Sequence, residues 1–117
     1  MITPIRILMV LAALTLFTAS AIHAGLLGAF DPFEAAALPE AIIGAVLLAG
    51  AVGTLFRWPG SWPLAFGATL FAVVGTLVGL RFTVPRGEPG DIAYHVSLLL
   101  ALLALTVLLV QRRRRHA

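Results

Sequence analysis

Cysteine and lysine are both absent from this 117-residue chain. Without cysteine, the chain can form no disulfide, no thiolate metal site and no cysteine nucleophile. Its eight Lys-or-Arg positions are therefore all arginine, and only five acidic residues accompany them. The motifs of serine hydrolases, phosphate-binding loops and zinc proteases are missing as well. These absences favour a protein without enzymatic activity of its own.

Apolar sequence, by contrast, is abundant. The chain is 61% hydrophobic and 11% charged, which is more apolar surface than a soluble domain of this size can bury. Four apolar segments are each close to the roughly 20 residues that cross a bilayer core, and they cover residues 4–23, 39–56, 63–82 and 92–110. Helices satisfy their own backbone hydrogen bonds in lipid. The sequence predicts a single transmembrane domain over 1–117, an all-α integral membrane four-helix bundle in up-down-up-down order.

Two features concern the first connection and the first span. In "DPFEAAAL", Asp31 and Glu34 have the spacing of a capping box and Pro32 stands at the first helical position, which predicts a short helix on the outer surface between the first two spans. The end of the first span, "ASA" at 19–21, resembles a signal-peptidase site. Cleavage of residues 1–21 as a signal peptide is therefore an open alternative to a retained helix.

The arginines predict an orientation. Arg6, Arg57 and the run 112–115 fall on one side of a four-span arrangement, and Arg81 and Arg86 fall on the other. Because cytoplasmic loops carry the excess of positive charge, we expect a multi-pass protein of the plasma (inner) membrane with both termini and the tail 111–117 in the cytoplasm. The tail is predicted to contact anionic lipid headgroups through Arg112, Arg113, Arg114 and Arg115. Its position beside an apolar span argues against nucleic acid as a partner.

Small residues recur at four-residue spacing in the two middle spans. The second span carries Ala45, Ala49 and Gly53, and the third carries Gly75 and Gly79. Such ridges let helix backbones approach closely in lipid. We expect Ala49, Gly53, Gly75 and Gly79 to pack the two middle helices together, with a homo-oligomer as the alternative use of a ridge.

Polar residues gather at the predicted outer ends of the spans. His23 ends the first span, Glu40 begins the second, Arg81 leaves the third, and Asp91 and His95 open the fourth. Asp91 and His95 are four residues apart and so share one helix face. Two histidines with carboxylates suit a divalent transition metal, and two facing histidines can hold a haem. His23, Glu40, Asp91 and His95 are therefore candidate metal ligands.

A structural interpretation without any cofactor competes with this site, and it is the one we favour. Asp91 follows Pro89-Gly90 at the start of a predicted helix, where an N-cap residue lies. Glu40 directly follows Pro39, where the helix macrodipole stabilises a carboxylate. Histidine rings are also well placed at the edge of lipid.

No acidic or basic residue lies beyond the first or last turn of any predicted span, although ion-coupled transporters commonly need one. In length and span number the chain resembles the small multidrug transporters and the small fluoride channels. It lacks the buried glutamate in the first helix of the former and the Gly-rich signature with a central arginine of the latter. We predict an accessory or structural membrane protein that contacts lipids and a partner in a larger complex. The alternatives are a metal- or haem-binding protein and a small oligomeric transporter or channel.

Overall fold

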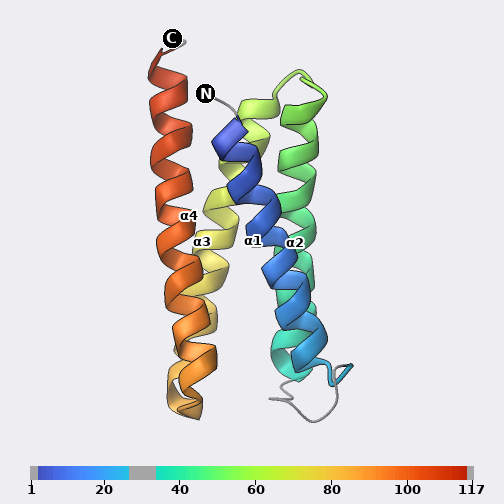
Figure 1. The fold of residues 1–117 in the computed structure, drawn as a ribbon, viewed down its shortest axis with the longest axis vertical. Helices are drawn as coiled ribbons and strands as arrows, with labels where there is room; N and C mark the ends of the chain where they lie inside the picture. The colour runs from blue at the N-terminus through green and yellow to red at the C-terminus, as the bar shows by residue number, and fades with distance from the viewer. Residues whose placement is uncertain (1–2, 27–33, 116–117) are drawn as a thin grey trace.

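A computed structural model describes residues 3–26 and 34–115, and this part of the chain contains four helices and no strand. They are α1 (Thr3–His23), α2 (Glu34–Leu55), α3 (Ser61–Arg86) and α4 (Pro89–Arg115), as Figure 1 shows. The predicted all-α fold is confirmed. All four helices are long and apolar enough to cross a membrane, with mean hydropathies between 1.9 and 2.4. The chain therefore has the make-up of a small membrane-embedded protein.

Contacts between helix ends show how the bundle is arranged. Arg6 near the start of α1 donates a hydrogen bond to the Thr54 carbonyl oxygen near the end of α2. Trp62 near the start of α3 donates to the Leu109 carbonyl oxygen near the end of α4. Helices α1 and α2 are thus antiparallel, and so are α3 and α4. Because α2 contacts α3 and α1 contacts α4 as well, the four helices form a bundle 47 Å long.

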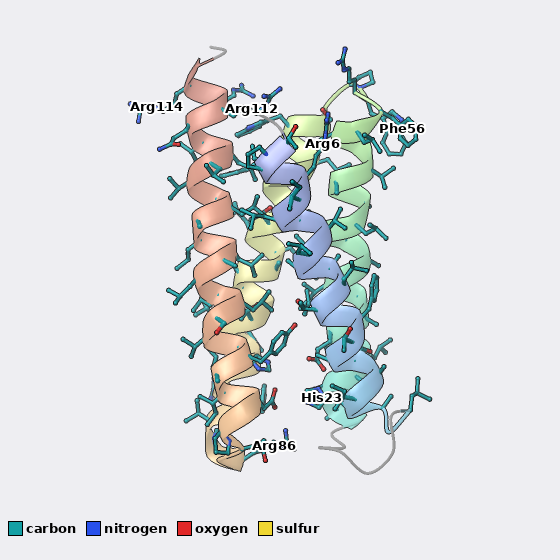
Figure 2. All side chains as sticks on the ribbon, viewed as in Figure 1. Arg6, His23, Phe56, Arg86, Arg112 and Arg114 are labelled. Atoms are coloured by element: carbon teal, nitrogen blue, oxygen red, sulfur yellow. The ribbon has the colours of Figure 1, made fainter. Side chains whose placement is uncertain are left out.

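The two ends of this bundle carry different side chains, as Figure 2 shows. We call one the arginine end, because Arg6, Arg57 and Arg112 lie there. The other is the histidine end, which holds His23, Glu40, Asp91 and His95. The first turn of α1 and the last turn of α4 share the arginine end.

The bundle core combines fully buried Met and Leu side chains with small residues. An added Cβ at Gly50 would lie 2.7 Å from Cε of Met9 and 3.3 Å from Cα of Ala65, so α2 approaches α1 and α3 closely at this glycine. Gly53 is also buried, but Ala49 lies on the exposed side of α2. The predicted packing position at Ala49 is therefore wrong by one residue, and Gly50 takes its place.

Two glycines of α3 lie where neighbouring side chains approach. A Cβ at Gly75 would meet Cδ1 of Ile43 on α2 at 2.5 Å. At Gly79, the same atom would lie 3.2 Å from the ring of His95 on α4. Gly75 therefore belongs to the α2–α3 contact, as expected, whereas Gly79 makes room for a histidine of the fourth helix.

Helix α2 starts five residues earlier than predicted. It begins at Glu34 and continues through Pro39, because the missing N–H of this proline removes only one backbone hydrogen bond, the one to the Ala35 carbonyl. Residues 34–38, which we expected in a separate surface helix, are thus the first turn of α2. The rest of that predicted helix, including Asp31 and Pro32, lies outside the described residues. Helices α3 and α4 likewise extend past their predicted ends, to Arg86 and Arg115.

Candidate functional site

The structure brings together the four candidate metal ligands of the sequence, which are His23, Glu40, Asp91 and His95. They come from α1, α2 and α4 and meet at the histidine end. All four residues are buried, with relative exposures of 2%, 5%, 6% and 6% in that order. The interpretation of the histidines as rings decorating the lipid edge is therefore wrong, since both are enclosed by the bundle.

Glu40 contacts α1 through one oxygen only. The Nδ1–H of His23 donates a hydrogen bond to Oε1 of Glu40, whereas the buried Oε2 has no hydrogen-bond partner. Because α2 begins at Glu34, this carboxyl group lies nearly two turns inside a candidate membrane span. The expectation that no acidic residue lies beyond the first or last turn of a span is wrong for α2.

Asp91 links three helices. Its Oδ2 lies 3.0 Å from Nη1 of Arg86 on α3 and 3.6 Å from Nε2 of His23 on α1. Its Oδ1 lies 3.1 Å from Nδ1 of His95 on the same helix. Since α4 begins at Pro89, Asp91 is the third residue of the helix and not its N-cap, and its carboxylate is directed at other side chains.

The arginine of this cluster is Arg86 and not Arg81. Arg81 is exposed in the body of α3, because this helix extends to Arg86. Gly87 then ends α3 in the left-handed conformation, with a φ of 71°, a conformation that glycine adopts without strain. The chain re-enters a helix at Pro89, which places Arg86 beside Asp91. The sequence signal for this neighbourhood was the close spacing of Arg86, Gly87 and Asp91.

His95 is oriented by its own helix. Its Nδ1–H donates a hydrogen bond of 2.8 Å to the Asp91 carbonyl oxygen, so in the neutral ring Nε2 carries a lone pair and accepts hydrogen bonds. Cδ2 and Nε2 form the ring edge nearest Gly79. The Tyr94 ring meets the imidazole edge-on, with centroids 5.4 Å apart.

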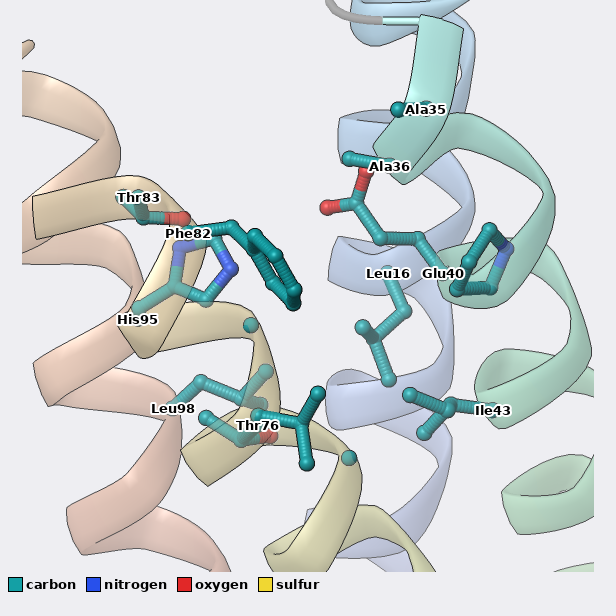
Figure 3. A pocket seen from close by; sticks show the side chains of 14 residues that line it. Leu16, Ala35, Ala36, Glu40, Ile43, Thr76, Phe82, Thr83, His95 and Leu98 are labelled. Carbon is teal, nitrogen blue, oxygen red and sulfur yellow. The ribbon is translucent and has the colours of Figure 1, made fainter. Parts of the chain in front are cut away.

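An apolar cavity of about 330 Å³ adjoins this cluster, between the halves of α2 and α3 at the histidine end. Thr76 and Thr83 line it together with apolar side chains. Glu40 and His95 line it as well and approach it from opposite sides in Figure 3. Val78 and Phe82 also line it and are 51% and 60% exposed. The cavity therefore opens at the exposed face of α3, which is the face that lipid would cover.

The polar side chains of this cluster contact one another. Within residues 3–26 and 34–115, no group of three His, Cys, Asp or Glu side chains is arranged to hold a metal ion. Divalent-metal and haem binding by His23, Glu40, Asp91 and His95 stay predictions.

Comparisons with protein-family models, with curated proteins and with solved structures found no match. The chemistry of the site is therefore the guide to its function. That site is a buried hydrogen-bonded cluster with one unpartnered oxygen, that of Glu40, next to an apolar cavity.

Proposed function

We propose that this chain is a membrane-embedded binding protein that holds a lipid-soluble molecule with a hydroxylated ring in the cavity between α2 and α3. The observation that carries the proposal is the Oε2 atom of Glu40, which is buried without a partner in a residue that lines this cavity. A buried acceptor without a donor costs about 1–3 kcal/mol. A hydroxyl group of a bound molecule would supply the missing donor.

The size of the cavity supports a small ring. A cavity of roughly 150 Å³ is enough for benzene, and this one measures about 330 Å³. It has space for one substituted ring and the beginning of an apolar tail. Phe82 on its rim offers an aromatic surface on which such a ring can stack. Because Val78 and Phe82 face outward, the molecule would enter sideways from the lipid.

The polar atoms of the cavity support a hydroxylated ligand. Glu40 Oε2 needs a donor, and Nε2 of His95 accepts when Nδ1 carries the ring proton. A ring with two hydroxyl groups, such as a hydroquinone, has one donor for each acceptor. An ammonium group would also donate, but a neutral hydroxyl is far less costly to bring through hydrocarbon.

Binding of a hydroquinone with a ten-carbon tail to the protein in lipid nanodiscs tests the proposal. The matched compound is its dimethyl ether, which keeps the ring and tail but has no donor. We expect the hydroquinone to bind about tenfold more tightly than the ether by calorimetry, because two hydrogen bonds to buried acceptors are lost.

Three variants distinguish ligand binding in the cavity from a general effect on the packing of the bundle. Val78→Trp narrows the cavity, since Val78 lines it, and should weaken binding, while the 51% exposure of Val78 leaves room for the larger ring outside the bundle core. Gly67→Leu on the same helix, where nothing lies within 4 Å of an added Cβ, should bind normally. Glu40→Gln keeps a carbonyl oxygen for His23 and turns an amide donor towards the cavity, so it should lose the preference for the hydroquinone. Equal affinities of the native protein for both compounds, or a preference that survives Glu40→Gln, would contradict the proposal.

We also propose an orientation of the bundle in the membrane. With the excess of arginine on the cytoplasmic side, the arginine end faces the cytoplasm of the inner membrane and the histidine end faces outward. A reporter fused after Ala117 should be active only in the cytoplasm, and one inserted at Glu88 only outside. The opposite pattern would reverse the orientation and leave the ligand site facing inward.

No specific contact among the described residues supports the other roles that the sequence predicts. A partner in a larger membrane complex, and an oligomeric transporter or channel, stay predictions. A binding protein of this kind is compatible with an accessory role, since it would present its ligand to a partner without transforming it.

A further inference from the structure

A second cavity, of about 340 Å³, lies at the arginine end of the bundle. Three arginines from three parts of the chain line it, together with uncharged side chains and no carboxylate. The arginines are Arg6 on α1, Arg57 after α2 and Arg112 on α4. All five acidic residues of the chain fall within 31–40 and 88–91. Glu40 and Asp91, which contact His23, lie at the histidine end. The residues that line the cavity at the arginine end include no acidic side chain.

Arg6 is fixed in place by α2. Its Nη2 donates to the carbonyl oxygen of Thr54 at 2.5 Å, and its Nε lies 3.3 Å from Oγ1 of the same residue. A guanidinium group has five N–H donors, so these two bonds orient the fork and leave further donors for a ligand.

Arg57 occupies a backbone conformation that normally selects glycine. Its φ is 54°, and the Trp58 N–H bonds to the Gly53 carbonyl while the Arg57 N–H bonds to that of Thr54. This is the Schellman ending of a helix, in which the left-handed residue is usually glycine. A non-glycine residue there is strained, and such strain is concentrated at functional positions. The side chain of this strained residue, Arg57, lines the cavity.

Trp62 forms another part of the cavity wall. Its Nε1–H donates to the Leu109 carbonyl oxygen at 2.9 Å, and the guanidinium carbon of Arg113 lies 4.8 Å from its ring centroid. Ser61, which also lines the cavity, begins α3 after Gly60, where no side chain caps the helix. The positive end of the α3 dipole therefore adds to the field of the arginines.

We propose that this cavity binds a phosphate group. Planar guanidinium forks match phosphate oxygens in a bidentate way, and a doubly charged anion would relieve the mutual repulsion of three arginines. Two sources present this chemistry, the headgroup of an anionic phospholipid and free inorganic phosphate. The inference does not depend on the cavity at the histidine end.

This assignment refines the predicted role of the arginine tail. Arg112 is half-buried and lines the cavity, whereas Arg113 lies over Trp62 and Arg114 is exposed outside it. The side chain of Arg115 lies outside the described residues. Of the tail residues, we therefore assign phosphate binding to Arg112, with Arg114 as the matched arginine beside the site.

Fluorescence of Trp62 reports on the cavity directly. The chain has two tryptophans, so Trp58→Phe leaves Trp62 as the single reporter. The protein is reconstituted in nanodiscs of phosphatidylcholine alone or with phosphatidic acid, and the first preparation is also titrated with inorganic phosphate. A saturable change with phosphatidic acid only identifies a lipid headgroup, and saturation by inorganic phosphate identifies the free anion. No change with either probe overturns the proposal.

Arginine variants in the same background locate the response. Arg6→Gln, Arg57→Gly and Arg112→Gln should each weaken the apparent affinity about tenfold, as expected for a lost charged hydrogen bond. Arg114→Gln should change it by less than about twofold. Arg57→Gly should relieve backbone strain, so its thermal melt distinguishes a loss of binding from a loss of stability. Equal weakening by Arg112→Gln and Arg114→Gln would show a diffuse charge effect and overturn the site.

Discussion

The histidine end and the arginine end of this bundle have cavities of similar size, about 330 and 340 Å³, but opposite arrangements of charge. At the histidine end, Glu40 and Asp91 contact His23, and Asp91 also contacts Arg86 and His95. At the arginine end, three like charges surround a cavity whose lining includes no carboxylate. At the histidine end, opposite charges of the chain contact one another and Oε2 of Glu40 is left without a partner, whereas the arginines that line the other cavity face no carboxylate there.

The difference separates two uses of polar groups in a membrane protein. Opposite charges that meet in a low-dielectric interior hold helices in one arrangement, and removing one partner leaves the others uncompensated. Like charges cannot stabilise one another and need an ion or a lipid from the surroundings. Among the described residues at the histidine end, Oε2 of Glu40 is the buried side-chain atom that lacks a hydrogen-bond partner, which is why a single neutral donor is enough there.

The largest expected effect comes from Asp91→Ala. Asp91 contacts side chains of α1, α3 and α4, and its loss leaves them without their shared carboxylate. Removing one partner of a buried charge cluster costs about 3–5 kcal/mol, which a denaturation curve in detergent would measure. Ser97→Ala is the control, because Ser97 is exposed on the same helix, and it should change stability by less than about 0.5 kcal/mol. Equal stability of both variants would mean that the cluster does not hold the helices, and the two ends would then differ less than we infer.

The sequence predicted the four helices well, and it predicted that His23 and His95 lie at the same end of the bundle. Apolar runs of membrane-spanning length identify four helices, and short connections place consecutive helix ends together. His23 and His95 stand at similar distances from their helix ends, which predicts that both lie near one face of the membrane. The four-residue spacing of Asp91 and His95 also predicts their contact, whereas the approach of the same carboxylate to His23 on α1 was not predicted.

The direction in which each helix faces could not be predicted with the same success. Helices that are apolar on all sides have no hydrophobic stripe to mark the buried face, so Ala49 was chosen where Gly50 is buried. Helix ends raised a second difficulty. Pro39 indicates a helix start, yet it lies inside α2, and this shift is what moves Glu40 away from the helix end and into the bundle.

The smallest expected effect has the opposite sign and belongs to the arginine end. Arg57→Gly places glycine where φ is 54°, and it should stabilise the protein by about 1 kcal/mol in phosphate-free detergent, because the left-handed conformation is strained for arginine. Gly60→Ala in the same turn is the matched control. Its φ is 75° and no atom lies within 4 Å of an added Cβ, so the backbone alone should make it less stable by a similar amount. A thermal melt of the two variants compares them directly. If Arg57→Gly lowers stability instead, Arg57 contributes to the fold itself, and the arginine end is satisfied from within like the histidine end.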